Sequence, residues 1–161
     1  MIIHFVCRGN AFRSIIAEAY LNSLGIKDWN TLSSGTAAAW DRANNLPYYR
    51  LTLDLLGKHG IRRFAKGHHG EQLTQERLEN ADIIVCMNQR VHDEVLQGAT
   101  FPVHLRIWSV ADIGEPGRIP ASDAERERFR EEAYQEIVGN VDQLVSGIHA
   151  AGFMHPLALG E

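Results

Sequence analysis

Short apolar runs alternate along this chain with segments whose apolar residues recur at helical spacing. The apolar runs predict strands at 2–6, 29–34, 82–87 and 103–108. The helical spacing predicts helices over 14–24, from Pro47 to Gly60, from Thr74 to about Asn80, from Asn88 to about Gln97, and after Ser122. Strands that alternate with helices indicate an α/β domain with a short parallel sheet.

Residues at the helix ends support these assignments. Pro47 suits a first helical position, so residues 36–46 are predicted to be a loop. Thr74 and Asn88 are suitable N-caps, and Ser122 with Glu125 has the spacing of a capping box. In the last helix one face is apolar, with Phe129, Ala133, Ile137, Val141, Leu144 and Ile148.

The segment between the first strand and the first helix has the composition of an anion-binding loop. Its residues are Cys7, Arg8, Gly9, Asn10, Ala11, Phe12, Arg13 and Ser14. Gly9 and Asn10 tolerate positive φ, which a loop needs to turn several N–H groups toward one point. The N-terminus of the following helix adds partial positive charge there. We therefore predict that residues 8–14 bind a phosphate group.

Two side chains of this loop suit chemistry on phosphorus. Arg13 can hold two phosphate oxygens at once, and the positive field favours the thiolate form of Cys7. A thiolate below a bound phosphate ester can attack the phosphorus atom. The hydroxyl of Ser14 either stabilises that thiolate or caps the helix.

Length and composition limit the number of domains, the partners and the cofactors that we expect. The 161 residues suffice for one domain with its own core, and the net charge of −4 predicts no nucleic-acid partner. Two cysteines do not form a disulfide framework, and eight histidines show no metal-ligand spacing, so we expect neither metal nor cofactor. A basic leader and a long apolar run are missing, which predicts a cytoplasmic protein with no membrane partner.

The stretch VCRGNAFRS followed by IIAEAYL resembles the signature of the low-molecular-weight protein tyrosine phosphatases. Ile15 stands where that family usually has proline. The resemblance implies a three-layer sandwich, a four-stranded parallel sheet in the order 2-1-3-4, and an active loop after strand 1. It places one domain at 1–150 and a loose tail at 151–161. It implies a phosphatase acting through phosphocysteine on a phosphorylated protein, with phosphotyrosine favoured, or on a small phosphate ester.

The resemblance also implies a carboxylic acid that protonates the leaving group. In the family this acid is the Asp of an Asp-Pro pair, and counting from Pro116 puts Glu115 at that position. Asp112 is the rival. The family's aromatic residues after the proline are replaced by Gly117 and Arg118, so Trp40 is expected to form the wall of the substrate slot.

Further residues follow by resemblance. Asn10 is expected to brace the loop together with Ser33 and His68, with the adjacent Ser34 and His69 as alternatives. Cys86 reads as a small buried core thiol, although thiol-dependent arsenate reductases of this fold pass a disulfide to a cysteine near this strand end. A third cysteine for that relay is missing here. The alternatives to a phosphatase are therefore an arsenate reductase or a phosphate-binding module with weakened catalysis.

Overall fold

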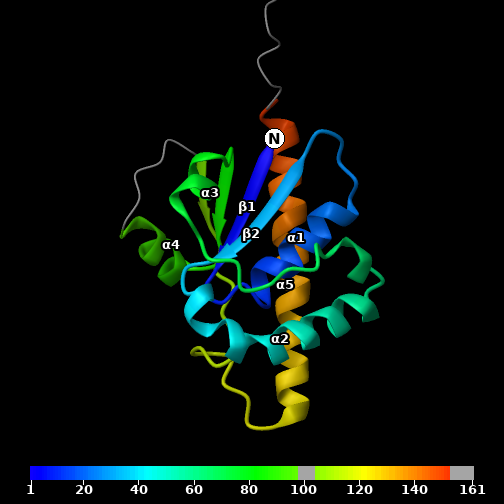
Figure 1. The fold of residues 1–161 in the computed structure, drawn as a ribbon. Helices are drawn as coiled ribbons and strands as arrows, with labels where there is room; N and C mark the ends of the chain where they lie inside the picture. Colours follow the sequence, from blue (N-terminus) through cyan, green and yellow to red (C-terminus); the bar gives the residue numbers. More distant parts are fainter. Residues whose placement is uncertain (98–103, 153–161) are drawn as a thin grey trace, which may run out of the picture.

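The computed structural model describes residues 1–97 and 104–152. The elements, in chain order, are β1 (Ile2–Cys7), α1 (Arg13–Ser23), β2 (Asn30–Gly35), α2 (Ala38–Lys58), the 3₁₀ turn η1 (Arg62–Phe64), α3 (Gln75–Glu79), β3 (Ile83–Cys86), α4 (Gln89–Leu96), β4 (His104–Ile107) and α5 (Asp123–Ala150). Figure 1 shows the strands side by side at the centre with helices around them. The predicted α/β class is confirmed.

The four strands form one parallel sheet in the order β2-β1-β3-β4, as expected. β1 therefore lies inside the sheet, with β2 on one side and β3 on the other. Because the strands are parallel, their carboxyl ends meet at one edge, where open α/β sheets bind ligands. Cys7, the last residue of β1, lies at this edge beside Gly35 of β2.

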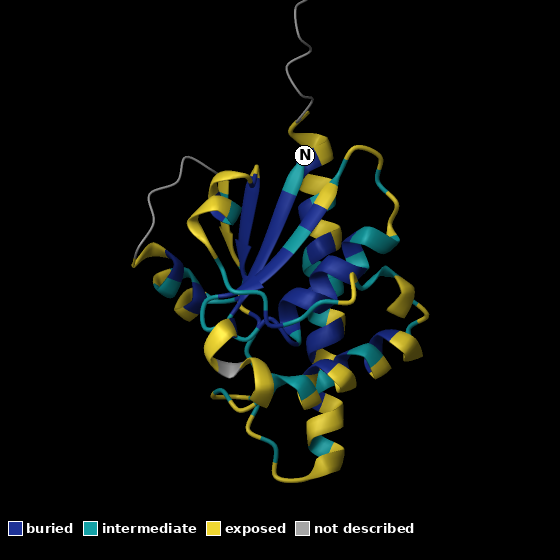
Figure 2. Cartoon of the chain, in the orientation of Figure 1, coloured by how far each residue is buried: buried dark blue, intermediate teal, exposed yellow. Residues whose placement is uncertain are grey.

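Alternate residues of β1 point to opposite faces of the sheet, and each face has its own apolar cluster. Ile3, Phe5 and Cys7 pack with buried residues of α1, α2 and α5. Val6 packs with Ile84 and Cys86 of β3 and with buried residues of α3 and α4. Figure 2 shows the buried residues of β1 and β3 between these two helical layers, whereas β4 at the edge of the sheet is largely exposed. The expected three-layer sandwich is present.

Helix ends agree with the caps expected from the sequence in three places. The side chains of Thr74, Asn88 and Ser122 accept hydrogen bonds from the backbone N–H groups of Arg77, Val91 and Glu125. All six apolar residues expected on one face of α5 are buried.

The start of α2 differs from its prediction. The helix begins at Ala38, so residues 38–46 are helical and Pro47 lies inside the helix. A proline removes one helical hydrogen bond, and the carbonyl that loses its partner belongs to Ala43. Both residues are exposed, so water can bind that carbonyl. The interruption is tolerated, and the prediction of a loop there was wrong.

Among the residues described, no helix combines the length and the apolar character needed to cross a membrane. Most of the predicted tail at 151–161 lies outside the described residues.

Candidate active site

The loop from Cys7 to Phe12 directs its backbone carbonyls outward, toward neighbouring segments. Six consecutive carbonyls accept hydrogen bonds from N–H, amide or hydroxyl groups around the loop. The pairs are Thr36 N with Cys7 O (3.0 Å), Ala37 N with Arg8 O (3.0 Å), Asn45 Nδ2 with Gly9 O (3.4 Å), Gly70 N with Asn10 O (2.9 Å), Thr52 Oγ1 with Ala11 O (2.7 Å) and Ile16 N with Phe12 O (3.0 Å). Outward carbonyls leave the N–H groups free to face the enclosed space, as an anion cradle requires.

The helix that follows contributes to the same cradle. α1 begins at Arg13 with no side-chain hydrogen bond capping it within the described chain, and its first turn carries no acidic residue. Its terminal N–H groups and the positive end of its dipole are thus not neutralised by a local carboxylate. This arrangement favours a bound anion such as phosphate.

The sulfur of Cys7 accepts a hydrogen bond from the backbone N–H of Asn10 at 3.2 Å and lies 3.1 Å from the Ser14 hydroxyl. The Asn10 side-chain amide donates to that hydroxyl oxygen at 3.1 Å. The Ser14 oxygen thus already serves as an acceptor, and its proton can be donated to sulfur. Two hydrogen-bond donors are thus directed at one sulfur, and Cys7 itself is 3% exposed.

Asn10 connects the loop to three other segments. It adopts a φ of 49°, and its side chain is fully buried. Its amide also donates to Ser33 Oγ of β2 at 3.0 Å, and its Oδ1 accepts from the Glu71 N–H at 2.9 Å. Asn10 thereby braces the loop in its positive-φ turn.

Gly35 lets β2 approach this loop closely. A Cβ atom at this position would lie 2.4 Å from the Arg8 carbonyl oxygen and 2.9 Å from the Asn10 nitrogen. Both are backbone atoms and cannot swing aside, so any larger residue would push the loop out of place.

A buried carboxylate completes the support behind the loop. Glu18 of α1 is 1% exposed, hydrogen-bonds Ser33, and lies 3.7 Å from Nε2 of His68. Burial raises the pKa of Glu18, against the opposing effects of the Ser33 hydroxyl and the nearby His68. His68 is therefore connected to Asn10 only indirectly, by a chain of contacts that runs from His68 to Glu18, from Glu18 to Ser33 and from Ser33 to Asn10. Sequence reasoning did not single out Glu18, although an acid in the apolar run of α1 is a signal for such a role.

The two adjacent alternatives face elsewhere. The Ser34 hydroxyl hydrogen-bonds Nε2 of His4, and the ring of His69 stacks on Tyr49 at 4.5 Å between centroids. Of the two pairs offered by the sequence, Ser33 and His68 lie on the side of the loop.

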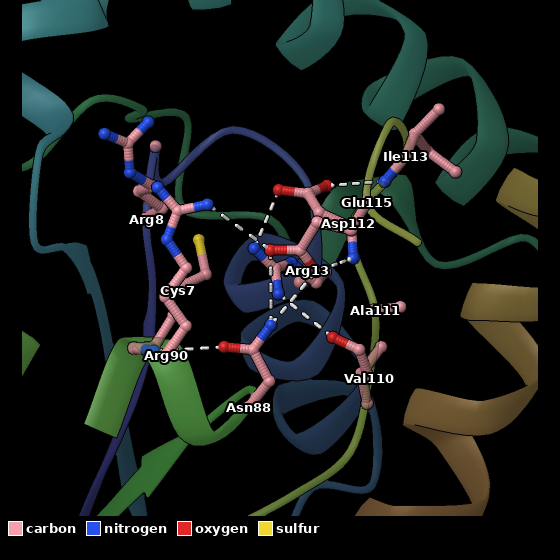
Figure 3. Close-up of polar contacts among 12 residues, drawn as sticks. Cys7, Arg8, Arg13, Asn88, Arg90, Val110, Ala111, Asp112, Ile113 and Glu115 are labelled. Atoms are coloured by element: carbon pink, nitrogen blue, oxygen red, sulfur yellow. Dashed lines mark hydrogen bonds and ion pairs between the residues drawn. The ribbon is translucent and has the colours of Figure 1, made fainter. Parts of the chain in front are cut away.

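The Arg13 guanidinium is held by the loop that precedes α5. Its NH1 donates to the Val110 carbonyl at 3.0 Å, and its NH2 donates to Asp112 Oδ2 at 2.7 Å (Figure 3). Arg13 is 1% exposed, whereas the Asp112 side chain is 38% exposed. Asp112 therefore stands at the opening of the site, joined to the arginine expected to bind phosphate.

Glu115 is turned toward its own loop. Its carboxylate accepts from the Asp112 N–H at 2.7 Å and from Asn88 Nδ2 at 3.1 Å, and it lies 3.9 Å from Arg90 (Figure 3). Glu115 thus fixes the backbone that carries Asp112. The two candidate acids thus have different partners: Asp112 contacts Arg13, whereas Glu115 contacts Asn88 and Arg90.

A cavity of about 410 Å³ opens over the loop. Its lining includes the loop residues Cys7, Arg8, Gly9, Ala11, Phe12 and Arg13, together with Asp112. Tyr48 of α2 provides an aromatic side chain, whereas Trp40 is absent from the lining among the described residues and is 88% exposed. Sequence reasoning missed Tyr48 because it placed Trp40 in a loop. Both residues belong to α2 but lie about two turns apart along the helix axis, so only the later one reaches the cavity.

Cys86 belongs to the other face of the sheet. It is fully buried in the apolar cluster with Val6 and Ile84, whereas Cys7 belongs to the cluster with Phe5. Burial raises the pKa of Cys86 to about 12. The described residues also contain no group of three or more His, Cys, Asp or Glu side chains placed to hold a metal ion.

Comparison with known proteins relates this geometry to a family. A protein-arginine-phosphatase of Bacillus subtilis (strain 168) is 29% identical over 96 residues, which cover 60% of this chain and 61% of the relative. The alignment thus spans less than two thirds of that relative.

Solved structures share the fold at low identity. Vibrio vulnificus Wzb in complex with benzylphosphonate superposes with a TM-score of 0.69 at 20% identity, over 91% of this chain and 97% of that one. An arginine phosphatase of Drosophila gives 0.66 at 20% identity, over 91% and 97%. The Corynebacterium glutamicum thioredoxin-dependent arsenate reductase gives 0.65 at 21% identity, over 93% and 62%.

The family model described as low molecular weight phosphotyrosine protein phosphatase matches residues 2–150, nearly the whole chain. The resemblance noted in the sequence is thereby confirmed, and this chain belongs to the low molecular weight phosphotyrosine protein phosphatase family.

Proposed function

We propose that this protein is a cysteine-dependent phosphatase that hydrolyses phosphate monoesters, with phosphotyrosine on a protein as the favoured substrate. The observation that carries the proposal is the sulfur of Cys7, which accepts hydrogen bonds inside a loop whose carbonyls all point outward. Family membership supports the same reaction class.

The reaction follows from this arrangement. The Cys7 thiolate attacks phosphorus, the bond from phosphorus to the ester oxygen breaks, and that oxygen leaves with a proton from a carboxylic acid. Loop N–H groups and Arg13 hold the phosphoryl oxygens throughout. Water then attacks the phosphocysteine and gives its proton to the same carboxylate, which releases inorganic phosphate and restores the thiolate.

We assign the acid role to Asp112 and a positioning role to Glu115. Asp112 lines the cavity together with Cys7, whereas the Glu115 carboxylate accepts a hydrogen bond from the backbone N–H of Asp112. A bound phosphate competes with Asp112 for the Arg13 guanidinium. This competition frees the Asp112 side chain to approach the leaving oxygen of the substrate.

The test of the nucleophile is Cys7→Ser. We expect hydrolysis of an aryl phosphate to fall by at least about 10³-fold, because a serine hydroxyl here has no base to activate it. Binding of inorganic phosphate, followed by calorimetry, should persist. Cys86→Ser is the matched control. Full turnover in Cys7→Ser would refute the proposal.

The test of the acid compares leaving groups. Asp112→Asn should slow phosphotyrosine hydrolysis by about 10²-fold and an activated aryl phosphate by much less, because a good leaving group needs no proton. Glu115→Gln should slow both substrates alike. If Glu115→Gln alone shows the leaving-group dependence, the acid is Glu115.

The substrate panel should include a phosphoarginine peptide, since two relatives are named as arginine phosphatases. Preferential turnover of that peptide would replace phosphotyrosine in this proposal. Arsenate reduction is less well supported, because the side chains of Cys7 and Cys86 belong to clusters on opposite faces of the sheet.

A further inference from the structure

The cavity over the loop has a wall that phosphate binding does not require. Arg126 and Arg130 of α5 line it together with Arg8, Arg13 and Asp112. Figure 1 shows that the first turns of α5 extend beyond the carboxyl edge of the sheet, on the side where the loop lies. The two arginines are four residues apart, so they project from one face of the helix.

The charge in this cavity exceeds the need of one phosphate. Loop N–H groups and Arg13 already provide donors for the phosphoryl oxygens. Arg126 and Arg130 add two guanidinium groups to a cavity whose lining includes one carboxylate, in a chain with a net charge of −4. A local excess of positive charge on an acidic protein points to a second anionic group on the ligand.

The ion pairs that Arg126 and Arg130 make within α5 leave both side chains able to bind an anionic ligand. Arg126 pairs with Asp123 at 3.2 Å, and Arg130 pairs with Glu127 at 3.3 Å. Both pairs are three residues apart on the helix, and the exposed pair of Arg126 contributes little free energy. Glu127 also pairs with Lys58, so its charge is shared. Each guanidinium has five N–H donors, more than these contacts use.

Arg130 is the stronger of the two positions. Its side chain is 12% exposed, whereas that of Arg126 is 45% exposed. Charge pairs are stronger where water is excluded, so a ligand anion should depend more on Arg130.

From the position of these side chains we infer that Arg126 and Arg130 form a subsite for a carboxylate on the substrate, adjacent to the phosphorylated residue. The inference rests on the proposed function, because it assigns the preferred substrates of the same site: phosphopeptides with Asp or Glu beside the phosphorylated side chain. Arg130 provides most of the affinity, and Arg126 guides the acidic residue at the rim.

The test uses two phosphotyrosine peptides that differ only in having Asp and Glu, or Asn and Gln, beside the phosphotyrosine. For the unaltered protein we expect kcat/KM to favour the acidic peptide by about tenfold at low salt, and less as salt rises. Arg130→Ala should reduce this ratio by about fivefold, and Arg126→Ala by about twofold.

Arg128→Ala is the matched control. Arg128 lies between the two arginines on the same helix, pairs with Glu125 at 2.9 Å and Glu132 at 3.8 Å, and is absent from the cavity lining within the described residues. It should leave the ratio unchanged. An equal loss in Arg128→Ala would show a general charge effect and overturn the inference. If Arg130→Ala fails to fold, the test compares Arg126→Ala with Arg128→Ala, because Arg126 is half-exposed.

Binding of both peptides to Cys7→Ser separates the two proposals. An acidic preference in binding without turnover in the unaltered protein would support the subsite and refute the phosphatase reaction. Equal turnover and equal binding of both peptides would refute the subsite and leave the phosphatase proposal intact.

Discussion

Cys7 and Cys86 occupy similar places and have opposite surroundings. Each ends a parallel strand, β1 or β3, and each is almost completely buried. The sulfur of Cys7 accepts a hydrogen bond from the Asn10 N–H and lies beside the Ser14 hydroxyl, on the face of the sheet covered by α1. Cys86 lies among apolar side chains on the other face, where burial raises its pKa to about 12. Burial alone thus keeps a thiol protonated, and directed donors are needed to offset it.

His4 shows the same contrast between the two faces of the sheet. It lies on β1 and hydrogen-bonds Ser34 and the Arg77 carbonyl, away from the loop. Burial lowers the pKa of His4 to about 4, so the ring is neutral at pH 7. His4 and Cys86, the two buried groups compared on this side of the sheet, are therefore both uncharged at pH 7. On the face of the sheet that α1 covers, the side chains of Arg13, Glu18 and Cys7 belong to networks of hydrogen bonds and ion pairs. This difference between the two faces places the reactive groups at the carboxyl end of β1.

Alkylation should distinguish the two thiols most strongly. At pH 7 we expect iodoacetamide to modify Cys7 at least about 10³-fold faster than Cys86, because a thiol with a pKa near 12 has almost no thiolate. Peptide mass spectrometry gives both rates. Inorganic phosphate should protect Cys7, and unfolding in urea should make the two rates similar. Equal rates in the folded protein would remove the distinction drawn above.

Acid should destabilise the protein through His4. Its pKa in the folded state is below the ordinary value of 6.5, so the unfolded chain binds the proton more readily. The stabilisation is complete above pH 6.5 and is lost as the pH falls toward 4, by about 3 kcal/mol in total. Urea unfolding between pH 7 and 4 measures it.

His4→Gln should flatten that pH dependence, and the exposed His104→Gln is its control. A dependence that survives in His4→Gln would mean that other groups carry the acid sensitivity.

Asn10→Ala tests whether the loop depends on its bracing. The change removes two donors, one acceptor and a residue suited to a φ of 49°. We expect kcat to fall by about 10- to 100-fold, since the Ser14 hydroxyl and the loop lose their orientation. Asn10→Gly accepts the same φ without the amide, so it separates side-chain loss from strain. Unchanged kcat in both variants would contradict the bracing role.

Cys86→Ala should have the smallest effect. A buried thiol that acts as a small apolar group leaves a small cavity when it is removed, at a cost of about 1 kcal/mol in unfolding free energy. Turnover should stay within about twofold of the original. A large loss of turnover with unchanged stability would instead give Cys86 a chemical role.

Much of the fold follows from the local pattern. Continuous apolar runs predict β1 and β3 because strands covered on both faces need no polar side. Thr74, Asn88 and Ser122 cap the helices that follow, because a capping side chain acts within three residues. The loop from Cys7 to Arg13 is recognisable for the same reason: strand, positive-φ turn and helix start are adjacent in sequence.

The rest depends on contacts between distant segments. Pro47 predicts a helix start by its own chemistry, yet α2 begins nine residues earlier because the lost hydrogen bond lies at the surface. On that longer helix Trp40 lies about two turns before Tyr48, and of the two only Tyr48 lines the cavity. The sequence favours Glu115 as the acid by its position before Pro116, and only the positions of Arg13 and Asn88 in the fold give Asp112 and Glu115 their different surroundings. Local pattern thus determines which elements form, whereas the packing of remote elements decides which side chains meet, because that depends on orientations that no single stretch of chain contains.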